Sequence, residues 1–88
     1  MASEERIKEL MTSNLRWSGP WADVDENYPL LENQVVDSLG MITLISLLEE
    51  EFDVEIDDGE VVPSNFRTIR NIAALVESKL ASGSSADS

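Results

Sequence analysis

The sequence contains neither cysteine nor histidine among its 88 residues. The missing cysteines exclude disulfides and thiolate chemistry, and without histidine a zinc site is disfavoured as well. Only three prolines and four glycines interrupt the chain, so long stretches can form helices. No apolar run approaches the roughly 20 residues that a membrane-spanning helix needs. We therefore expect a helical protein without disulfides, metal ligands or a membrane span.

Basic side chains are also scarce, since six Lys and Arg face eighteen Asp and Glu and the formal net charge is −12. Nucleic acids and anionic membrane surfaces are disfavoured as partners, because phosphate contacts need Lys and Arg. We expect protein partners with basic patches, whose association is steered by charge and weakened by salt. The small size and negative charge favour a monomer. The acidic start, residues 1–5, argues against an ordinary signal peptide, and the absence of cysteine fits a cytoplasmic location.

Apolar spacing predicts an all-α fold, a small irregular four-helix bundle of three long helices and one short helix. The expected helices cover residues 4–15, 38–51, 58–65 and 69–80. Together they make one domain over residues 1–80. Residues 81–88 contain only Ala, Ser, Gly and Asp, and are expected to form a disordered tail.

A long connection, residues 16–37, joins the first two predicted helices. Its Gly-Pro and Tyr-Pro pairs break regular structure. It also contains Trp17, Trp21 and Tyr28, which a solvated linker would not carry. We expect this loop to pack over the helices.

The tripeptide Asp37-Ser38-Leu39 lies where this loop meets the second predicted helix. Asp37 is expected to cap the helix, which leaves the Ser38 hydroxyl exposed near the positive helix end, a position suited to a phosphate. The chain has no histidine to activate the serine, and neither Lys8 nor Lys79 is near it in the sequence. Ser38 is therefore predicted to be an attachment point and not a catalytic nucleophile.

Three segments extend this pattern. Residues 36–40 read Val-Asp-Ser-Leu-Gly, residues 48–56 read Leu-Glu-Glu-Glu-Phe-Asp-Val-Glu-Ile, and residues 65–69 read Asn-Phe-Arg-Thr-Ile. An isolated Asp-Ser-Leu is common by chance, but its place before an acidic helix, with a Thr-Ile helix at the right distance, is far more specific. Over residues 3–80 the chain resembles the acyl and peptidyl carrier proteins, in particular the stand-alone type.

The resemblance implies a non-enzymatic carrier with a 4′-phosphopantetheine group on Ser38, flanked by Asp37 and Leu39. A phosphopantetheinyl transferase using Mg²⁺ would install the group from coenzyme A, and the chain itself would bind no metal. The thiol of the group would hold acyl or aminoacyl intermediates as thioesters. Expected partners are that transferase, an acyl-loading ligase or transferase, and a downstream synthase or condensation enzyme with a basic docking patch.

The resemblance also implies a partner-recognition surface on the second and third helices. Its apolar members would be Leu39 and Ile42, for which burial in the core is the alternative. Its acidic members, for which a solvated face is the alternative, would be Glu49, Glu50, Asp57, Asp58 and Glu60.

Three residues depart from the fatty-acid carriers: Val36 stands where Ala is usual, and Gly40 and Thr43 stand where further acids are usual. With residues 30–36 (Leu-Leu-Glu-Asn-Gln-Val-Val), they favour carriers that work with adenylating ligases in polyketide, nonribosomal peptide or lipopeptide biosynthesis. A fatty-acid or D-alanyl carrier, or an acidic interaction module without cofactor, is the alternative. Gly40 weakens its helix by up to ~1 kcal/mol, which close approach of a partner or of the attached arm would explain.

Two further features have competing interpretations. Residues 23–27 begin like an EF-hand loop, but Tyr28 replaces the glycine at its sixth position and Gln34 the glutamate at its twelfth. A calcium site is therefore disfavoured. Trp17 and Trp21 either contact a carried acyl group or seal the core beneath the loop, and the second role is favoured.

Overall fold

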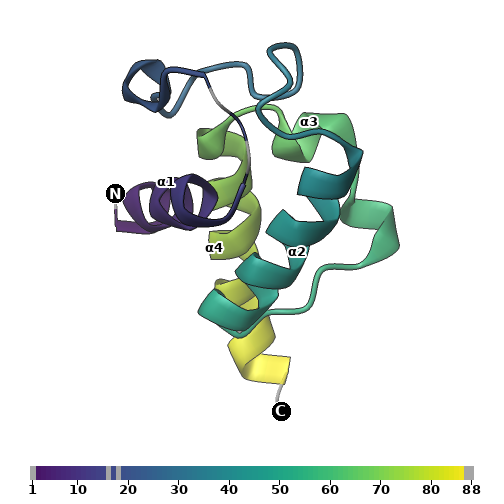
Figure 1. The fold of residues 1–88 in the computed structure, drawn as a ribbon. Coiled ribbons are helices and arrows are strands. Elements are labelled where there is room, and N and C mark those ends of the chain that lie inside the picture. Colours follow the sequence, from purple (N-terminus) through teal and green to yellow (C-terminus); the bar gives the residue numbers. More distant parts are fainter. Residues whose placement is uncertain (1, 16, 18, 87–88) are drawn as a thin grey trace.

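The fold is seen in a computed structural model that describes residues 2–15, 17 and 19–86 (Figure 1). Four α-helices and two single 3₁₀ turns make up its regular structure: α1 (Ala2–Asn14), η1 (Trp21–Asp23), α2 (Ser38–Phe52), η2 (Asp58–Glu60), α3 (Pro63–Phe66) and α4 (Ile69–Ala86). Strands are absent from these residues. The prediction of an all-α fold with three long helices and one short helix is confirmed.

Helix α4 is the central element, because it contacts each of the other three α-helices. Figure 1 shows α2 running beside α4, α1 on the other side, and α3 at the end where α2 begins. The loop between α1 and α2 arches over this same end. The start of α2 is therefore surrounded by the loop, α1 and the segment that leads into α3.

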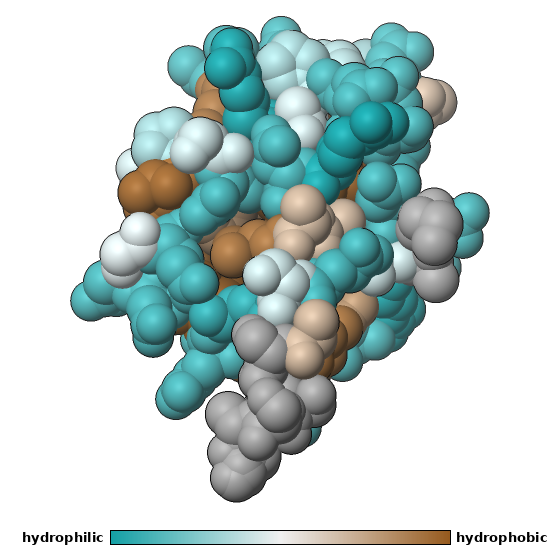
Figure 2. All heavy atoms as spheres, turned by 180° about the vertical axis from the view of Figure 1, so that it is seen from behind, coloured by the Kyte–Doolittle hydropathy of each residue, from teal (hydrophilic) through white to brown (hydrophobic). Residues whose placement is uncertain are grey.

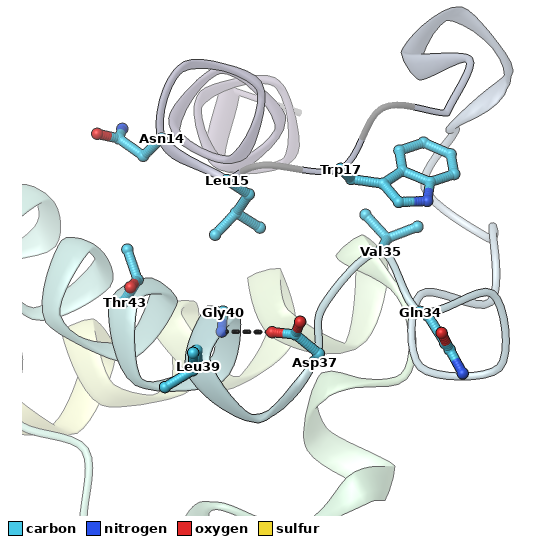
Figure 3. Close-up of a pocket in the computed structure, with 9 residues that line it drawn as sticks. All are labelled: Asn14, Leu15, Trp17, Gln34, Val35, Asp37, Leu39, Gly40 and Thr43. Carbon is cyan, nitrogen blue, oxygen red and sulfur yellow. Dashed lines mark hydrogen bonds between the residues drawn. The ribbon is translucent and has the colours of Figure 1, made fainter.

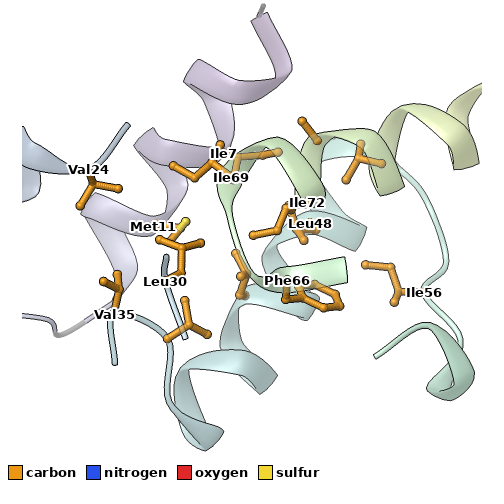
Figure 4. Close-up of a cluster of buried hydrophobic side chains, with 14 residues drawn as sticks. Ile7, Met11, Val24, Leu30, Val35, Leu48, Ile56, Phe66, Ile69 and Ile72 are labelled. Atoms are coloured by element: carbon orange, nitrogen blue, oxygen red, sulfur yellow. The ribbon is translucent and has the colours of Figure 1, made fainter. Parts of the chain in front are cut away.

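The core is entirely apolar in the described residues and draws on every α-helix and on the long loop (Figure 4). Fourteen side chains are buried in it: Ile7, Met11, Val24, Leu30, Val35, Val36, Leu44, Leu48, Ile56, Phe66, Ile69, Ile72, Ala73 and Val76. Phe66 alone anchors the four-residue α3, since it is that helix's one buried residue. Apolar spacing on α2 predicts that Leu44, Leu47, Leu48 and Phe52 face the core. Leu44 and Leu48 are buried, whereas Leu47 and Phe52 are half-buried.

The long loop packs on the helices, as predicted. Lys8 Nζ donates to the Val24 carbonyl (2.6 Å), and the Leu30 N–H donates to the Arg67 carbonyl (2.7 Å). Trp17 and Trp21 meet edge to face, with ring centroids 5.1 Å apart, and both pack against the core. The favoured packing role of the two tryptophans is therefore confirmed, although Trp17 also lines a surface groove.

Two predicted boundaries are wrong. The expected helix over residues 58–65 is instead the turn η2 followed by α3, because Val62 precedes a proline and is extended (φ −127°, ψ 153°). Pro63 then opens α3, a position that needs no N–H donor. The last helix, expected over residues 69–80, instead continues to Ala86, since extending an existing helix needs no new nucleus. The disorder expected for residues 81–88 stays a prediction, and residues 87 and 88 lie outside the described residues.

Within the described ranges, none of the helices combines the length and the apolar character that crossing a membrane would require.

Replacing Phe66 by alanine should destabilise the fold by about 3–5 kcal/mol, because the ring is completely buried and its loss leaves a cavity. That is a large part of the 5–15 kcal/mol typical of a whole domain. Urea unfolding followed by circular dichroism measures the loss. The control is Leu80→Ala, at a side chain that is 40% exposed, which should cost less than about 1 kcal/mol. Equal losses in the two variants would contradict the assignment of Phe66 as the anchor of α3.

Candidate functional site

Ser38 is the first residue of α2, and its side chain is exposed. The preceding Asp37 is extended (φ −97°, ψ −168°), and its Oδ1 accepts from the Gly40 N–H (2.7 Å). The Asp37 carbonyl accepts from the Met41 N–H (2.7 Å), which closes the first turn. The predicted cap and the predicted exposure of the serine are confirmed. No hydrogen bond within the described residues engages the Ser38 hydroxyl.

The two lysines that could have activated the serine have other partners. Lys8 Nζ donates to the Val24 carbonyl, and Lys79 Nζ forms an ion pair with Glu60 Oε1 (2.6 Å). A Ser–Lys catalytic pair at Ser38 is therefore not present in this fold.

Gly40 leaves room for the cap. A Cβ placed on this residue would lie 3.2 Å from Asp37 Oδ1, closer than most side chains tolerate, and 3.7 Å from Leu15 Cδ2 of the segment that leaves α1. The glycine thus lets the aspartate carboxylate approach the first turn of α2, whereas the distance to Leu15 is that of an ordinary van der Waals contact. This close packing gives a physical reason for a residue that otherwise weakens a helix.

Two grooves flank the start of α2 and share Gln34 and Asp37 on their common border. The α1-side groove has a volume of about 410 Å³ (Figure 3), and its other lining residues are Asn14, Leu15, Trp17, Val35, Leu39, Gly40 and Thr43. The α3-side groove has a volume of about 600 Å³, and its other lining residues are Leu31, Val36, Ser38, Met41, Val61, Val62 and Pro63. Gln34 has a φ of 59°, a left-handed conformation that is uncommon outside glycine.

The apolar residues of the predicted recognition surface are on the outside of the molecule. Leu39 is 76% exposed and Ile42 is 64% exposed, so the alternative that they belong to the core is wrong. Both lie on α2 within one turn of Ser38. A partner that covered them would remove a large apolar area from water. Their role in recognition stays a prediction.

The predicted acidic residues divide into two groups. Glu50, Asp57 and Asp58 are exposed. Glu49 and Glu60 are half-buried and have intramolecular partners: Glu49 Oε2 accepts from the Ile56 N–H (2.9 Å), and Glu60 Oε1 accepts from both the Asp57 N–H (2.9 Å) and Lys79 Nζ (2.6 Å). These two carboxylates stabilise the segment between α2 and α3.

Sequence reasoning missed how the few basic residues are used. In the part of the chain that the structure describes, each Lys and Arg side chain contacts an oxygen atom of another residue. The contacts are Arg6 with Glu9 and Glu51, Lys8 with the Val24 carbonyl, Arg67 with Glu32, Arg70 with Glu26, and Lys79 with Glu60. Most join segments distant in the sequence. The scarcity of bases was the only sequence signal for this. The face seen in Figure 2 is mostly hydrophilic, with hydrophobic atoms near its centre and at a few places toward its edges.

The ion pairs shift the pKa of two glutamates. The hydrogen bond from Lys79, and secondarily the Asp57 N–H, lowers the pKa of Glu60 below its ordinary value. The hydrogen bond from Arg6 likewise lowers the pKa of Glu51. A lowered folded-state pKa means that each interaction stabilises the fold above the ordinary glutamate range and is lost as pH falls through the folded-state pKa.

The residues that resemble an EF-hand start serve the loop's own backbone. Asp25 Oδ1 accepts from the Asn27 N–H (2.9 Å), a local turn typical of aspartate. The described residues contain no group of three or more acidic side chains arranged to hold a metal ion.

Comparison with known proteins identifies relatives over nearly the whole chain. The family profile described as "Phosphopantetheine attachment site" matches residues 5–76. The probable acyl carrier protein PigG of Serratia sp. (strain ATCC 39006) is 37% identical over 77 residues, which cover 88% of this chain and 86% of the relative. Aminoacyl carrier protein 2 of Bradyrhizobium diazoefficiens is 32% identical over 85 residues, which cover 92% and 90%.

The fold is similar to that of a solved carrier. The solution structure of a holo acyl carrier protein from Nitrosomonas europaea superposes with a TM-score of 0.78 at 29% sequence identity. The match covers 92% of this chain and 99% of that protein.

The Glu60→Gln variant should be less stable than the original protein at about pH 7, because it loses the ion pair with Lys79 but keeps an oxygen for the Asp57 N–H. The stability difference should narrow as pH is lowered toward about 2, since protonated Glu60 cannot form the pair either. Urea unfolding of both proteins across this range measures the difference.

The matched control is Glu32→Gln, which breaks the more exposed pair with Arg67. Exposed pairs contribute little, so its loss at neutral pH should be the smaller of the two. A pH-independent difference for Glu60→Gln would contradict the role assigned to its charge.

Proposed function

The chain belongs to the phosphopantetheine-binding family of carrier proteins, and on this basis we propose that Ser38 is its attachment residue. Members of this family carry a phosphopantetheine group and are not themselves catalytic. The observation that supports the assignment is the position of Ser38, which is exposed at the first residue of α2, capped by Asp37 and inside the matched region. The family's need for an accessible serine hydroxyl is met here.

The residues around Ser38 fit a phosphodiester. The Gly40 N–H donates to Asp37 Oδ1, and the Met41 N–H donates to the Asp37 carbonyl. The N–H groups of Ser38 and Leu39 have no hydrogen-bond partner among the described residues. Unpaired N–H groups at a helix start favour a phosphate. The bound group would supply the thiol that this cysteine-free chain lacks and would hold acyl or aminoacyl intermediates as thioesters.

The protein's own contribution would be presentation and recognition. Leu39 and Ile42 place exposed apolar area beside the serine, and Glu50, Asp57 and Asp58 add exposed negative charge. We propose that this surface receives the transferase, the loading enzyme and the downstream synthase through basic patches on each. Glu49 and Glu60 would contribute less directly, because their carboxylates already accept hydrogen bonds from the protein.

A role in polyketide, nonribosomal peptide or lipopeptide biosynthesis is the favoured setting. Relatives named as acyl and as aminoacyl carriers support either type of cargo. Gly40 and Thr43, where fatty-acid carriers usually have acids, line the α1-side groove in this chain. This use of the two positions favours a dedicated pathway over a fatty-acid or D-alanyl carrier. The proposal includes a monomer acting in the cytoplasm, which suits a chain without cysteine.

Incubation with coenzyme A, Mg²⁺ and a broad-specificity phosphopantetheinyl transferase should add the mass of one phosphopantetheine group, because Ser38 has an accessible hydroxyl. Intact-mass spectrometry measures the gain. Ser38→Ala should abolish it. The control is Ser46→Ala, at another exposed serine of α2, which should keep it. No gain with several transferases would refute the assignment and favour the acidic interaction module without cofactor. A gain that persists in Ser38→Ala would refute Ser38 as the attachment residue.

Replacing Ile42 by alanine should raise the KM of the carrier for the transferase about 5- to 30-fold, as expected for an apolar interface residue worth roughly 1–2 kcal/mol. Stability should change by less than about 0.5 kcal/mol, because the side chain is 64% exposed. Steady-state kinetics and urea unfolding give the two quantities. The control Leu80→Ala removes an exposed apolar side chain from α4 and should leave KM unchanged. An unchanged KM in Ile42→Ala would exclude Ile42 from this interface.

A further inference from the structure

Ser38 is exposed without the α1-side groove, yet the side chains in the wall of this groove are held in place by specific contacts. Trp17 forms part of this wall. A Cβ on Gly19 would lie only 2.2 Å from Trp17 Cζ2, so the indole can occupy this place only because residue 19 is glycine. Trp21 contacts the same ring edge to face and donates from Nε1 to the Trp17 carbonyl (3.1 Å). These contacts fix the orientation of Trp17 without any ligand, which is typical of a preorganised binding surface.

The floor of the groove lies between α1 and α2. Figure 3 shows Leu15 pointing down toward α2, Thr43 pointing up from α2, and Gly40 on α2 below Leu15. Gly40 has no side chain to fill this space, and a Cβ there would reach 3.7 Å from Leu15 Cδ2. The groove therefore extends along the first turns of α2, beginning at residues adjacent to Ser38.

The polar groups of the groove have unused hydrogen-bonding capacity. The side chains of Gln34 and Thr43 have no hydrogen-bond partner among the described residues, and Asn14 uses its Nδ2 on the Leu10 carbonyl, which leaves its amide oxygen as an acceptor. The Asp37 carboxylate uses only Oδ1 in the cap. The groove thus offers donors and acceptors among apolar surfaces. The α3-side groove differs, because its lining apart from Ser38 and the shared border is apolar.

We propose that the α1-side groove is the resting site of the phosphopantetheine arm. The arm is a flexible chain in which two secondary amides alternate with methylene and methyl groups, and the groove presents the same alternation of polar and apolar groups. Ser38 itself lines the α3-side groove, and Asp37 borders both grooves, but Leu39, the residue after Ser38, lines only the α1-side groove. The arm can therefore enter the α1-side groove without rearranging α2. This inference rests on the proposed attachment at Ser38.

The site has a consequence for partner binding. Leu39 lines the groove and is also 76% exposed beside Ser38. A partner that covers Leu39 would close the entrance and favour the extended arm. The resting arm and the docked partner therefore compete for one side chain.

The test uses the absence of cysteine, which makes the thiol of the arm the only thiol in the holo protein. A nitroxide maleimide on this thiol broadens nearby amide signals in ¹H–¹⁵N spectra, and chemical reduction of the nitroxide gives the diamagnetic reference. We expect strong broadening at Gly40, Thr43 and the Trp17 indole N–H, and weak broadening at Val61 and Val62. Broadening centred on Val61 and Val62, or spread evenly over the surface, would overturn the proposal.

Two variants test the polar contacts. Thr43→Val removes the hydroxyl with little change in shape, and Gln34→Gly removes the amide at a position whose φ of 59° suits glycine. Each should lower the ratio of docked to free arm about 2- to 10-fold, the effect of one net hydrogen bond. The control Val62→Ala, in the α3-side groove, should leave the broadening pattern unchanged.

The two proposals fail in distinguishable ways. If intact mass shows that Ser38 is not modified, no labelled protein forms, and the proposed function fails together with this inference. If labelled protein forms but the broadening misses the α1-side groove, or is the same in Thr43→Val and Gln34→Gly as in the original chain, the resting site alone is overturned.

Discussion

The hydrogen bond from the Gly40 N–H to Asp37 Oδ1 determines where α2 begins, and the functional surface depends on that start. A cap of this kind contributes about 0.5–2 kcal/mol. Its structural effect is larger, because a helix that begins at residue 38 places Ser38 in the first turn and leaves Leu39 and Ile42 on the outside. The missing side chain of Gly40 is part of the same arrangement, since a Cβ there would crowd the capping carboxylate.

The balance of charge has a comparable influence on the rest of the molecule. With so few basic residues, each one that the structure describes joins two parts of the fold, such as Arg6 between α1 and the end of α2, or Lys79 between α4 and η2. No Lys or Arg among the described residues is left over to neutralise exposed acids such as Glu50, Asp57 and Asp58. The few basic side chains therefore link segments of the fold, and the remaining acidic side chains leave a negatively charged surface for partner recognition.

The long loop connects packing with function. Val24, Leu30, Val35 and Val36 belong to this loop and are buried, so the loop contributes to the core as the helices do. The same loop carries Trp17 and Gln34 to the edge of α2, where they line the α1-side groove. A connection of this length without long helices of its own is uncommon, and here it forms walls on both sides of the candidate attachment serine.

Local sequence patterns were enough to predict the three long helices, the Asp37 cap and the exposed Ser38. Apolar spacing marks α1, α2 and α4, and Asp37 before Ser38 marks the start of α2, because caps and helix periodicity involve residues within a few positions of each other. Tertiary structure decided what those signals could not. Only folding showed that Ile42 is exposed, that Glu49 and Glu60 are engaged inside the protein, and that Gly19 gives Trp17 its place. Glu60 meets Lys79 across 19 residues and Arg6 meets Glu51 across 45, and no local pattern specifies contacts at such separations. Their geometry arises from how the helices and the loop pack around α4.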